Sequence, residues 1–209
     1  MIFIINAENR QIFTADLQEM HRQRKHVFVD ESRWNVPVVG DMEIDCYDRA
    51  DTTYLIAKCE IDGPVLASVR LLPTVKAHLM ADLFANACTG TIPRGEAVWE
   101  ASRFCAVPTL QSQRTRVDLL WEIICGVMET SLLFGVEQVL FVANAALLPR
   151  AMTCGWDAEV LGPTLKLGDE EITAVTARIT PEGLRTVRSR FGFDSPVTRF
   201  LTPMARIAA

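Results

Sequence analysis

Charged side chains interrupt otherwise apolar segments of this chain, and they are the first candidates for chemistry. Arginines and carboxylates are rarely buried unless they are paired or serve a ligand. A zwitterionic, cationic metabolite suits such a set, because its carboxylate can bind an arginine and its cationic groups can bind carboxylates or an aromatic face. Three cations and three anions qualify by their context: Arg24, Arg70, Arg103, Asp45, Asp48 and Glu100.

The segment 98–104, with the sequence VWEASRF, carries the strongest of these signals. It has the pattern of a buried strand, yet it contains Glu100 and Arg103. A spacing of three residues places the two side chains on opposite faces of a regular strand, because side chains alternate. Two interpretations stay open. Either the charges form only structural ion pairs, or both face one cleft, which requires a β-bulge between them.

Hydrophobic periodicity predicts a mixed order of helices and strands around one sheet. Strands are expected at 2–5, 53–59, 65–72, 97–107, 139–143, 161–166 and 172–179. Helices are expected from residue 9 or 14 to 28, and over 116–134, 145–153 and 181–191. Asp62 and Gly63 predict a hairpin between the second and third strands. The chain shows no internal repeat and no low-complexity linker, which predicts a single domain over 1–209.

Residues 30–51 form a long segment without clear periodicity. They include four acids, Asp41, Glu43, Asp45 and Asp48, and more apolar residues than a disordered loop normally has. Loops of this length are usually functional or disordered. We expect this one to be ordered and folded over a site.

Composition argues against several classes of protein. With 21 basic and 26 acidic residues, the net charge is −5, which argues against nucleic acid as the main partner because phosphate binding requires a basic surface. The six cysteines contain no C-x-x-C pair and there are three histidines, so we expect no metal site and reduced thiols in a cytoplasmic protein. The most apolar stretch, 132–148, is broken by polar residues, so we expect no membrane span.

The charged and aromatic residues of this chain, in their order and spacing, resemble those of the acyl-homoserine-lactone synthases of the LuxI type. The phrases RWNVPVVGDMEIDCYD, VRLLPT and VWEASRF carry the resemblance from about residue 20 to 107. Later segments, GW at 155–156 and LGPTLKLG at 161–168, extend it weakly. Nine positions match together: Arg24, Phe28, Trp34, Asp45, Asp48, Arg70, Phe84, Glu100 and Arg103.

The resemblance implies an α/β fold similar to the GCN5-related N-acetyltransferases, a three-layer sandwich with a mixed central sheet. In that fold two strands, here 97–107 and 139–143, splay into a V-shaped cleft that admits an acyl thioester. Ordinary acetyltransferases carry a glycine-rich phosphate-binding turn before the long helix, whereas segment 108–115, PTLQSQRT, has no glycine. This departure favours the synthases. An N-acyltransferase that uses acyl-CoA on a small amine is the alternative.

The reaction implied by the resemblance makes a quorum-sensing signal in two steps. The amine of S-adenosylmethionine attacks an acyl thioester, carried by acyl carrier protein or coenzyme A, to form an amide. The methionine carboxylate then closes the lactone and releases methylthioadenosine. The first step needs a general base, for which Glu100 is the candidate. No tightly bound cofactor and no metal are implied.

The resemblance also implies where each substrate binds. S-adenosylmethionine is expected at Arg24, Phe28, Trp34, Asp45 and Arg103, beneath a lid formed by 30–48. Asp48 and Arg70 are expected to pair with these charged residues without contacting S-adenosylmethionine. Phe84 is expected either to pack in the core or to contact the ligand. The acyl pocket is expected at Ser102, Leu120, Phe141, Ala143, Leu147 and Met152, where Ala143 replaces a threonine that accompanies 3-oxo substrates in the family. An acidic acyl carrier protein is expected to dock on Arg114, Arg116, Arg150 and Lys166.

Overall fold

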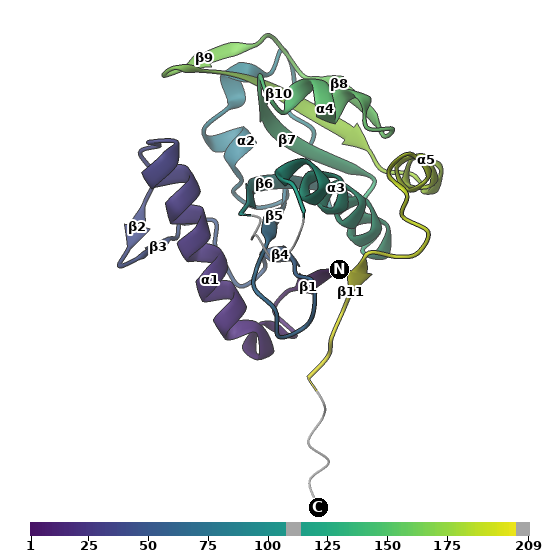
Figure 1. The fold of residues 1–209 in the computed structure, drawn as a ribbon. Coiled ribbons are helices and arrows are strands. Elements are labelled where there is room, and N and C mark those ends of the chain that lie inside the picture. The colour runs from purple at the N-terminus through teal and green to yellow at the C-terminus, as the bar shows by residue number, and fades with distance from the viewer. Residues whose placement is uncertain (108–113, 204–209) are drawn as a thin grey trace, which may run out of the picture.

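The computed structural model describes residues 1–107 and 114–203 (Figure 1). Within these ranges the main sheet has nine strands, in the order β11-β1-β4-β5-β6-β7-β10-β8, with β9 paired to β10 beside that path. The strands are β1 (Ile2–Ile5), β4 (Thr53–Ala57), β5 (Ala67–Pro73), β6 (Val98–Ala106), β7 (Gln138–Asn144), β8 (Asp157–Val160), β9 (Leu165–Leu167), β10 (Glu170–Arg178) and β11 (Thr198–Arg199). A separate two-stranded sheet consists of β2 (Val38–Val39) and β3 (Met42–Glu43).

Helices cover both faces of the main sheet (Figure 1). On one face lies α1 (Thr14–Arg24), and on the other lies α3 (Arg116–Leu133) with α5 (Pro181–Phe191) packed against it. Two short helices, α2 (Leu79–Asp82) and α4 (Leu148–Thr153), lie next to the strands that form the site. The structure therefore has the three layers and mixed sheet that the family resemblance implies.

Alternation along the strands explains why both faces need a cover. In β1 all four residues are buried. Ile2 and Ile4 belong to the apolar cluster beneath α3, whereas Phe3 and Ile5 belong to the cluster beneath α1. A strand with apolar residues on both sides can be buried only between two helical layers.

The predicted splay between two central strands is confirmed. β6 and β7 run parallel and pair only from Val98 opposite Gln138 to Glu100 opposite Leu140. Beyond these three pairs β6 continues to Ala106 and β7 to Asn144 without pairing to one another. The resulting V holds a cavity that is partly open to solvent, described below with the site.

Most predicted elements are confirmed to within a few residues. The strand at 2–5 and the helix at 181–191 match at both ends. The antiparallel pairing of β4 with β5 confirms the hairpin, but nine residues, 58–66, connect the two strands. The turn at Gly63, whose N–H donates to the Glu60 carbonyl at 3.1 Å, is only one part of that connection.

Other predictions are wrong in detail. The segment 30–51 is more regular than expected, because a π-helical turn extends the first helix to Glu31 and β2 and β3 form a hairpin at Gly40, whose φ of +62° suits glycine. The strand predicted at 161–166 overlaps only the start of β9, and β8 ends before it. The helix predicted at 145–153 begins at Leu148. Neither α2 nor β11 was predicted, because four and two residues are too few for a periodic pattern.

Candidate active site

Arg24 anchors the site from the end of α1. Its side chain is 1% exposed, and its Nε donates to Glu43 Oε2 at 2.5 Å. Its two terminal nitrogens donate to the two oxygens of Asp48 at 2.8 and 3.0 Å. Burial alone would lower the pKa of Arg24, but the hydrogen bonds and charges of Asp48 and Glu43 outweigh it and raise that pKa. The apolar stripe of the helix thus carries a permanently charged group that needs its two carboxylates.

Arg70, in the centre of β5, is the second buried cation. Its Nη1 and Nη2 donate to the two oxygens of Asp45 at 2.5 and 3.1 Å, and Nη1 also lies 3.0 Å from Asp48 Oδ1. Its Nε donates to Ser102 Oγ on β6 at 3.1 Å. Tyr54 donates its hydroxyl to Asp48 at 2.8 Å. Every donor atom of this guanidinium therefore has an acceptor within the protein.

Arg103 reaches the same cluster through a β-bulge. The register between β5 and β6 shifts, so that Ser68 opposes Cys105 and Arg70 opposes Ser102, with two residues of β6 left opposite Val69. Arg103 is the first of those two, and it has a φ of +56°, a left-handed conformation that non-glycine residues rarely adopt. The bulge does not lie between Glu100 and Arg103, as one of the two interpretations required: residues 100–102 pair regularly with β5, and the bulge consists of Arg103 and Phe104.

The bulge directs Arg103 toward carboxylates instead of into the α3 layer. Its Nη2 lies 2.9 Å from Asp45 Oδ2, and its Nε donates to Glu43 Oε1 at 3.1 Å. Its guanidinium carbon lies 5.6 Å from the centre of the Phe28 ring, a cation–π distance. Glu43, which sequence reasoning left out of the site, is fully buried and links Arg24 to Arg103.

The cluster of three arginines with Glu43, Asp45 and Asp48 has a closed side and an accessible side. The side chains of Arg103 and Asp45 are 9% and 5% exposed, the highest values of the six. Arg24 lies behind them with its guanidinium fully engaged, so its expected contact with a ligand gains no support from this arrangement. Arg70 and Asp48 lie behind, as expected.

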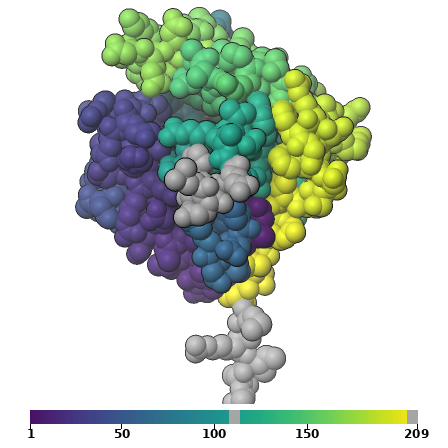
Figure 2. All heavy atoms as spheres, viewed as in Figure 1, coloured from purple at the N-terminus to yellow at the C-terminus, as the bar shows by residue number. Residues whose placement is uncertain are grey.

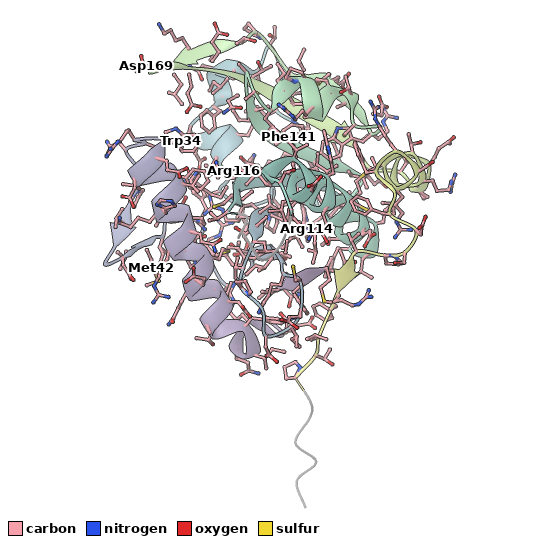
Figure 3. All side chains as sticks on the ribbon, in the orientation of Figure 1. Trp34, Met42, Arg114, Arg116, Phe141 and Asp169 are labelled. Atoms are coloured by element: carbon pink, nitrogen blue, oxygen red, sulfur yellow. The ribbon has the colours of Figure 1, made fainter. Side chains whose placement is uncertain are left out.

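Two aromatic side chains cover the accessible side. Phe28 lies in the π-helical turn, and its ring stacks on Trp34 with centroids 4.9 Å apart and planes 14° from parallel. Trp34 is 38% exposed, and its Nε1 donates to Glu170 Oε1 on β10 at 3.1 Å. Figure 3 labels Trp34 near the end of this helix, on the side of the β9–β10 hairpin. Trp34 thus links the segment 30–48 to β10, which is far from it in the sequence.

Glu100 lies at the point where β6 and β7 separate. It is 1% exposed, and its two carboxylate oxygens accept the N–H of Met80 in α2 at 3.1 and 3.2 Å. Burial raises the pKa of Glu100 to about 7, and the Met80 hydrogen bond only partly opposes that rise. A carboxyl group with this pKa can accept or donate a proton at neutral pH. Phe84 packs nearby against Leu72 and Leu140, so the structure gives it a packing role.

The V between β6 and β7 contains a cavity of about 100 Å³. Four residues expected in an acyl pocket line it, namely Ser102, Leu120, Phe141 and Leu147. Ala143 and Met152 do not line it: the Ala143 methyl group is fully enclosed beside β10, and Met152 packs against the main core. Trp156 lines the cavity and had been noted only as part of a weak motif.

The four residues expected to dock a carrier lie on three elements. Arg114 and Arg116, labelled in Figure 3, are at the start of α3 and lie 2.5 and 3.5 Å from Glu122 and Glu31 respectively. Arg150 on α4 donates to the Ala146 carbonyl at 2.6 Å, and Lys166 on β9 is exposed opposite Glu171. Most of the glycine-free segment 108–115 lies outside the described residues.

Other features of the described residues lie outside this site. The six cysteines are all free, and Cys46 and Cys59 are exposed, whereas Cys105, Cys125 and Cys154 are buried. No group of three or more His, Cys, Asp or Glu side chains could hold a metal ion, and no helix is long and apolar enough to cross a membrane, within residues 1–107 and 114–203.

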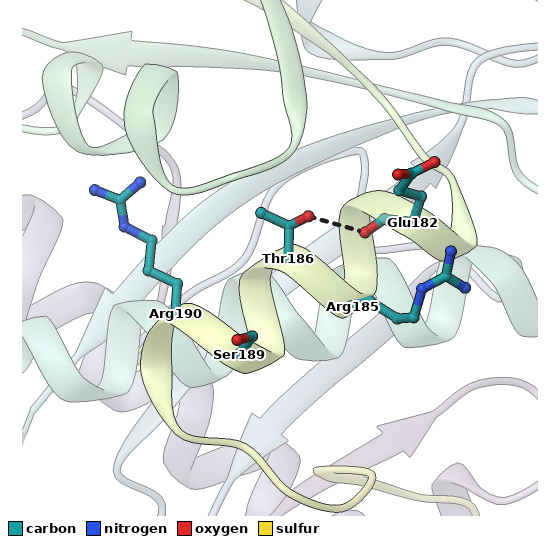
Figure 4. A pocket seen from close by; sticks show the side chains of 5 residues that line it. All are labelled: Glu182, Arg185, Thr186, Ser189 and Arg190. Atoms are coloured by element: carbon teal, nitrogen blue, oxygen red, sulfur yellow. Dashed lines mark hydrogen bonds between the residues drawn. The ribbon is translucent and has the colours of Figure 1, made fainter.

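A hollow of about 440 Å³ lies on the exposed face of α5, between Glu182 and Arg190 (Figure 4). It involves one helix only, and its one drawn hydrogen bond runs along that helix from Thr186.

Figure 2 shows, in a space-filling view, α1 in purple on the left, the α3 region in teal in the centre and the later strands in green at the top. Comparison with known proteins identifies this arrangement. A family model described as autoinducer synthase matches residues 8–186. The isovaleryl-homoserine lactone synthase of Bradyrhizobium diazoefficiens is 31% identical over 200 residues, which cover 94% of this chain and 88% of that protein.

Solved structures agree with the sequence comparison. BjaI, described as a CoA-dependent acyl-homoserine lactone synthase with SAM and isopentyl-CoA, superimposes with a TM-score of 0.87 at 28% identity, covering 97% of this chain and 94% of that one. An acyl-CoA N-acyltransferase of Pseudomonas aeruginosa has a TM-score of 0.56 at 20% identity, covering 84% of this chain and 98% of that one. This likeness confirms the N-acyltransferase-like fold. The chain therefore belongs to the autoinducer synthase family and is an acyl-homoserine-lactone synthase, an acyltransferase.

Proposed function

We propose that this synthase acylates S-adenosylmethionine at the Arg103 side of the charged cluster, with Glu100 as the general base, and that the acyl chain occupies the cavity between β6 and β7. One observation carries the proposal. The charged cluster and the cavity meet on β6, where Ser102 accepts the Arg70 hydrogen bond and also lines the cavity. Glu100, with a pKa of about 7, lies two residues before this junction.

The charges of S-adenosylmethionine match the accessible side of the cluster. Its carboxylate pairs with Arg103, and its ammonium group pairs with Asp45, as charge-assisted hydrogen bonds require. Its sulfonium lies against the Phe28 and Trp34 rings, whose faces attract cations. Arg24, Arg70, Glu43 and Asp48 hold these groups in position without contacting the ligand, because their polar atoms are engaged with one another.

Amide formation requires that the ammonium group lose a proton before it attacks the thioester. Glu100 accepts this proton, directly or through one water molecule, since its pKa of about 7 leaves much of it ionised at neutral pH. The attack turns the thioester carbonyl into an oxyanion, which needs hydrogen-bond donors. The edge of β6 beyond Glu100 has no β7 partner among the described pairs, and we assign its backbone N–H groups to that task.

Lactone closure is intramolecular. The carboxylate of the acylated intermediate attacks the methionine side-chain carbon that is bonded to sulfur. The bond between that carbon and sulfur breaks, and methylthioadenosine leaves with the electron pair. No proton transfer is needed in this step. Arg103, Phe28 and Trp34 accelerate ring closure by holding the carboxylate in line with this carbon, because a bound, aligned nucleophile reacts as if it were at very high concentration.

We propose acyl-CoA as the acyl donor, and acyl carrier protein as the alternative. The structurally similar BjaI is described as CoA-dependent and was solved with isopentyl-CoA. The basic residues on α3, α4 and β9 are the feature that favours an acidic carrier protein. We also propose a cytoplasmic location, which the six free cysteines support.

The test is a reaction of the purified protein with S-adenosylmethionine and acyl-CoA, followed by mass spectrometry. We expect an acyl-homoserine lactone and methylthioadenosine in equal amounts, together with free coenzyme A. An N-acyltransferase would release coenzyme A and acylate a small amine without any methylthioadenosine. Formation of that second product set would overturn the proposal.

A further inference from the structure

The cavity between β6 and β7 has one wall built from aromatic rings that the mechanism above does not use. Trp156 lies between α4 and β8, and its side chain is largely buried. Its ring centre lies 5.5 Å from that of Phe141 on β7, with the planes 35° apart. Figure 3 labels Phe141 beside the start of α3, whose Leu120 and Ile124 form the facing wall.

A hydrogen bond of Trp156 and the close packing of the preceding Gly155 fix the position of the indole. Its Nε1 donates to the Ala151 carbonyl in α4 at 2.7 Å, and this bond is buried. If the indole swung away, a buried N–H would lose its acceptor, which is costly. Gly155 precedes it with a φ of +123°, and a Cβ atom there would lie 2.9 Å from the Thr186 side chain of α5. The segment is therefore held between α4 and α5, and the aromatic wall cannot retreat easily from a longer ligand.

Because this wall is fixed, the volume of the cavity limits the length of the acyl chain that it can hold. Its volume is about 100 Å³. An apolar cavity of about 150 Å³ in another protein accommodates benzene, a ring of six carbons. In proportion, the cavity between β6 and β7 accommodates about four carbon atoms.

We infer that the synthase is specific for short acyl groups of about four or five carbons, straight or branched, and that Trp156 sets the upper limit. The inference rests on the proposed function, because it takes the cavity to be the acyl site. A chain of eight carbons would have to displace the Phe141–Trp156 wall. Misfit of even one methylene in an apolar pocket changes specificity by about tenfold or more.

The experiment measures kcat/KM for acyl-CoA donors with straight chains of four, eight and twelve carbons and with a branched five-carbon chain. Release of methylthioadenosine is the readout, and the same series attached to acyl carrier protein is run in parallel. We expect the four- and five-carbon donors to exceed the eight-carbon donor by about tenfold or more on either carrier. Equal or better use of the eight- or twelve-carbon donor would overturn the inference and leave the proposed function intact. No lactone from any donor would overturn the proposed function itself.

Two variants and a matched control test the role of the wall. Leu147→Ala removes three carbons from the cavity lining, and Trp156→Phe shortens the aromatic wall. Leu148→Ala makes the same change at the next residue, which packs against the same core but does not line the cavity. We expect both wall variants to raise the ratio of eight-carbon to four-carbon kcat/KM by about fivefold or more, with Leu148→Ala leaving that ratio unchanged. An unchanged ratio in Trp156→Phe, with KM for S-adenosylmethionine also unchanged, would show that Trp156 does not set the limit.

Discussion

The backbone N–H of Met80 lies 3.1 and 3.2 Å from the two carboxylate oxygens of Glu100. Met80 belongs to α2, a helix of four residues that covers the end of the β6–β7 pairing. The hydrogen bond favours the ionised carboxylate, but burial disfavours it more, and the pKa of Glu100 rises to about 7. A carboxyl group that is 1% exposed, at the point where β6 and β7 separate, therefore changes charge near neutral pH.

Glu100 should reduce the stability of the folded protein at high pH. Its folded pKa of about 7 lies above the unfolded value of 4.5. Its ionisation therefore costs nothing below pH 4.5, becomes unfavourable as pH rises toward 7, and is fully unfavourable above pH 7. We expect Glu100→Gln to stabilise the fold by about 1–3 kcal/mol at pH 8 and by much less at pH 5, measured by urea unfolding.

Glu129 provides the matched control for that experiment. It is also a buried glutamate, but it accepts hydrogen bonds from Arg188 and from the N–H groups of Val197 and Thr198. Burial would raise the pKa of Glu129, yet these partners outweigh burial and lower it. Glu129→Gln should therefore destabilise the fold at pH 8. Destabilisation by both variants at pH 8 would contradict the assigned direction for Glu100.

Substitution of Arg103 should separate ligand binding from backbone strain. We expect Arg103→Ala to weaken binding of S-adenosylmethionine by about tenfold or more, because a carboxylate loses its charge-assisted partner. Arg103→Gly should weaken binding equally but fold more stably than Arg103→Ala, because glycine tolerates the φ of +56°. Calorimetric titration and thermal unfolding of both variants provide the two readouts. Wild-type affinity in either variant would remove Arg103 from the ligand site.

Much of this site could be predicted from the sequence, because charges inside apolar segments need partners. Arg24 interrupts an apolar segment, where a charge is rarely buried without a partner, and Glu43 and Asp48 are its partners. The spacing of Glu100 and Arg103 called for a bulge between them only if both faced one cleft, and the bulge of β6 instead starts at Arg103. What the sequence could not reveal was whether a buried arginine faces a ligand or a protein carboxylate.

The parts that sequence reasoning missed depend on contacts between distant segments. Glu43 lies in β3, and its partners Arg24 and Arg103 are brought to it only by the fold. The alternation of Glu43, Ile44 and Asp45 was the available signal, since it points both acids to one side of an extended segment. The contribution of Trp156 to the wall of the cavity likewise depends on how α4 and α5 pack.

The contact between Trp34 and Glu170 should orient the lid. We expect Glu170→Ala to raise the KM for S-adenosylmethionine by about two- to tenfold, because Trp34 loses its hydrogen-bond acceptor. Glu170→Gln keeps an acceptor oxygen and should have a smaller effect. Glu171→Ala, at the next residue of β10, serves as the control. Equal KM values for all three variants would show that the contact does not orient Trp34 for binding.

Arg150 and Lys166 test the choice of acyl donor. If they dock an acidic carrier protein, reversing both to glutamate should lower the rate with acyl carrier protein at low salt and flatten its salt dependence. A matched reversal of Arg178 and Arg185, two exposed cations on β10 and α5, applies the same charge change elsewhere. We expect that control to retain its rate. A double variant at Arg150 and Lys166 with wild-type activity toward the carrier would show that these residues do not dock it.

The central claim is that Glu100 takes the proton from the amine of S-adenosylmethionine. Its most direct test is the single-turnover rate of amide formation as a function of pH, for wild type and for Glu100→Gln, at saturating concentrations of both substrates. The account predicts that the wild-type rate rises with pH through about 7, as the carboxyl ionises. It also predicts that Glu100→Gln lowers the rate by about 10²–10⁴-fold and abolishes this rise. A near wild-type rate with the same pH dependence in Glu100→Gln would contradict the account.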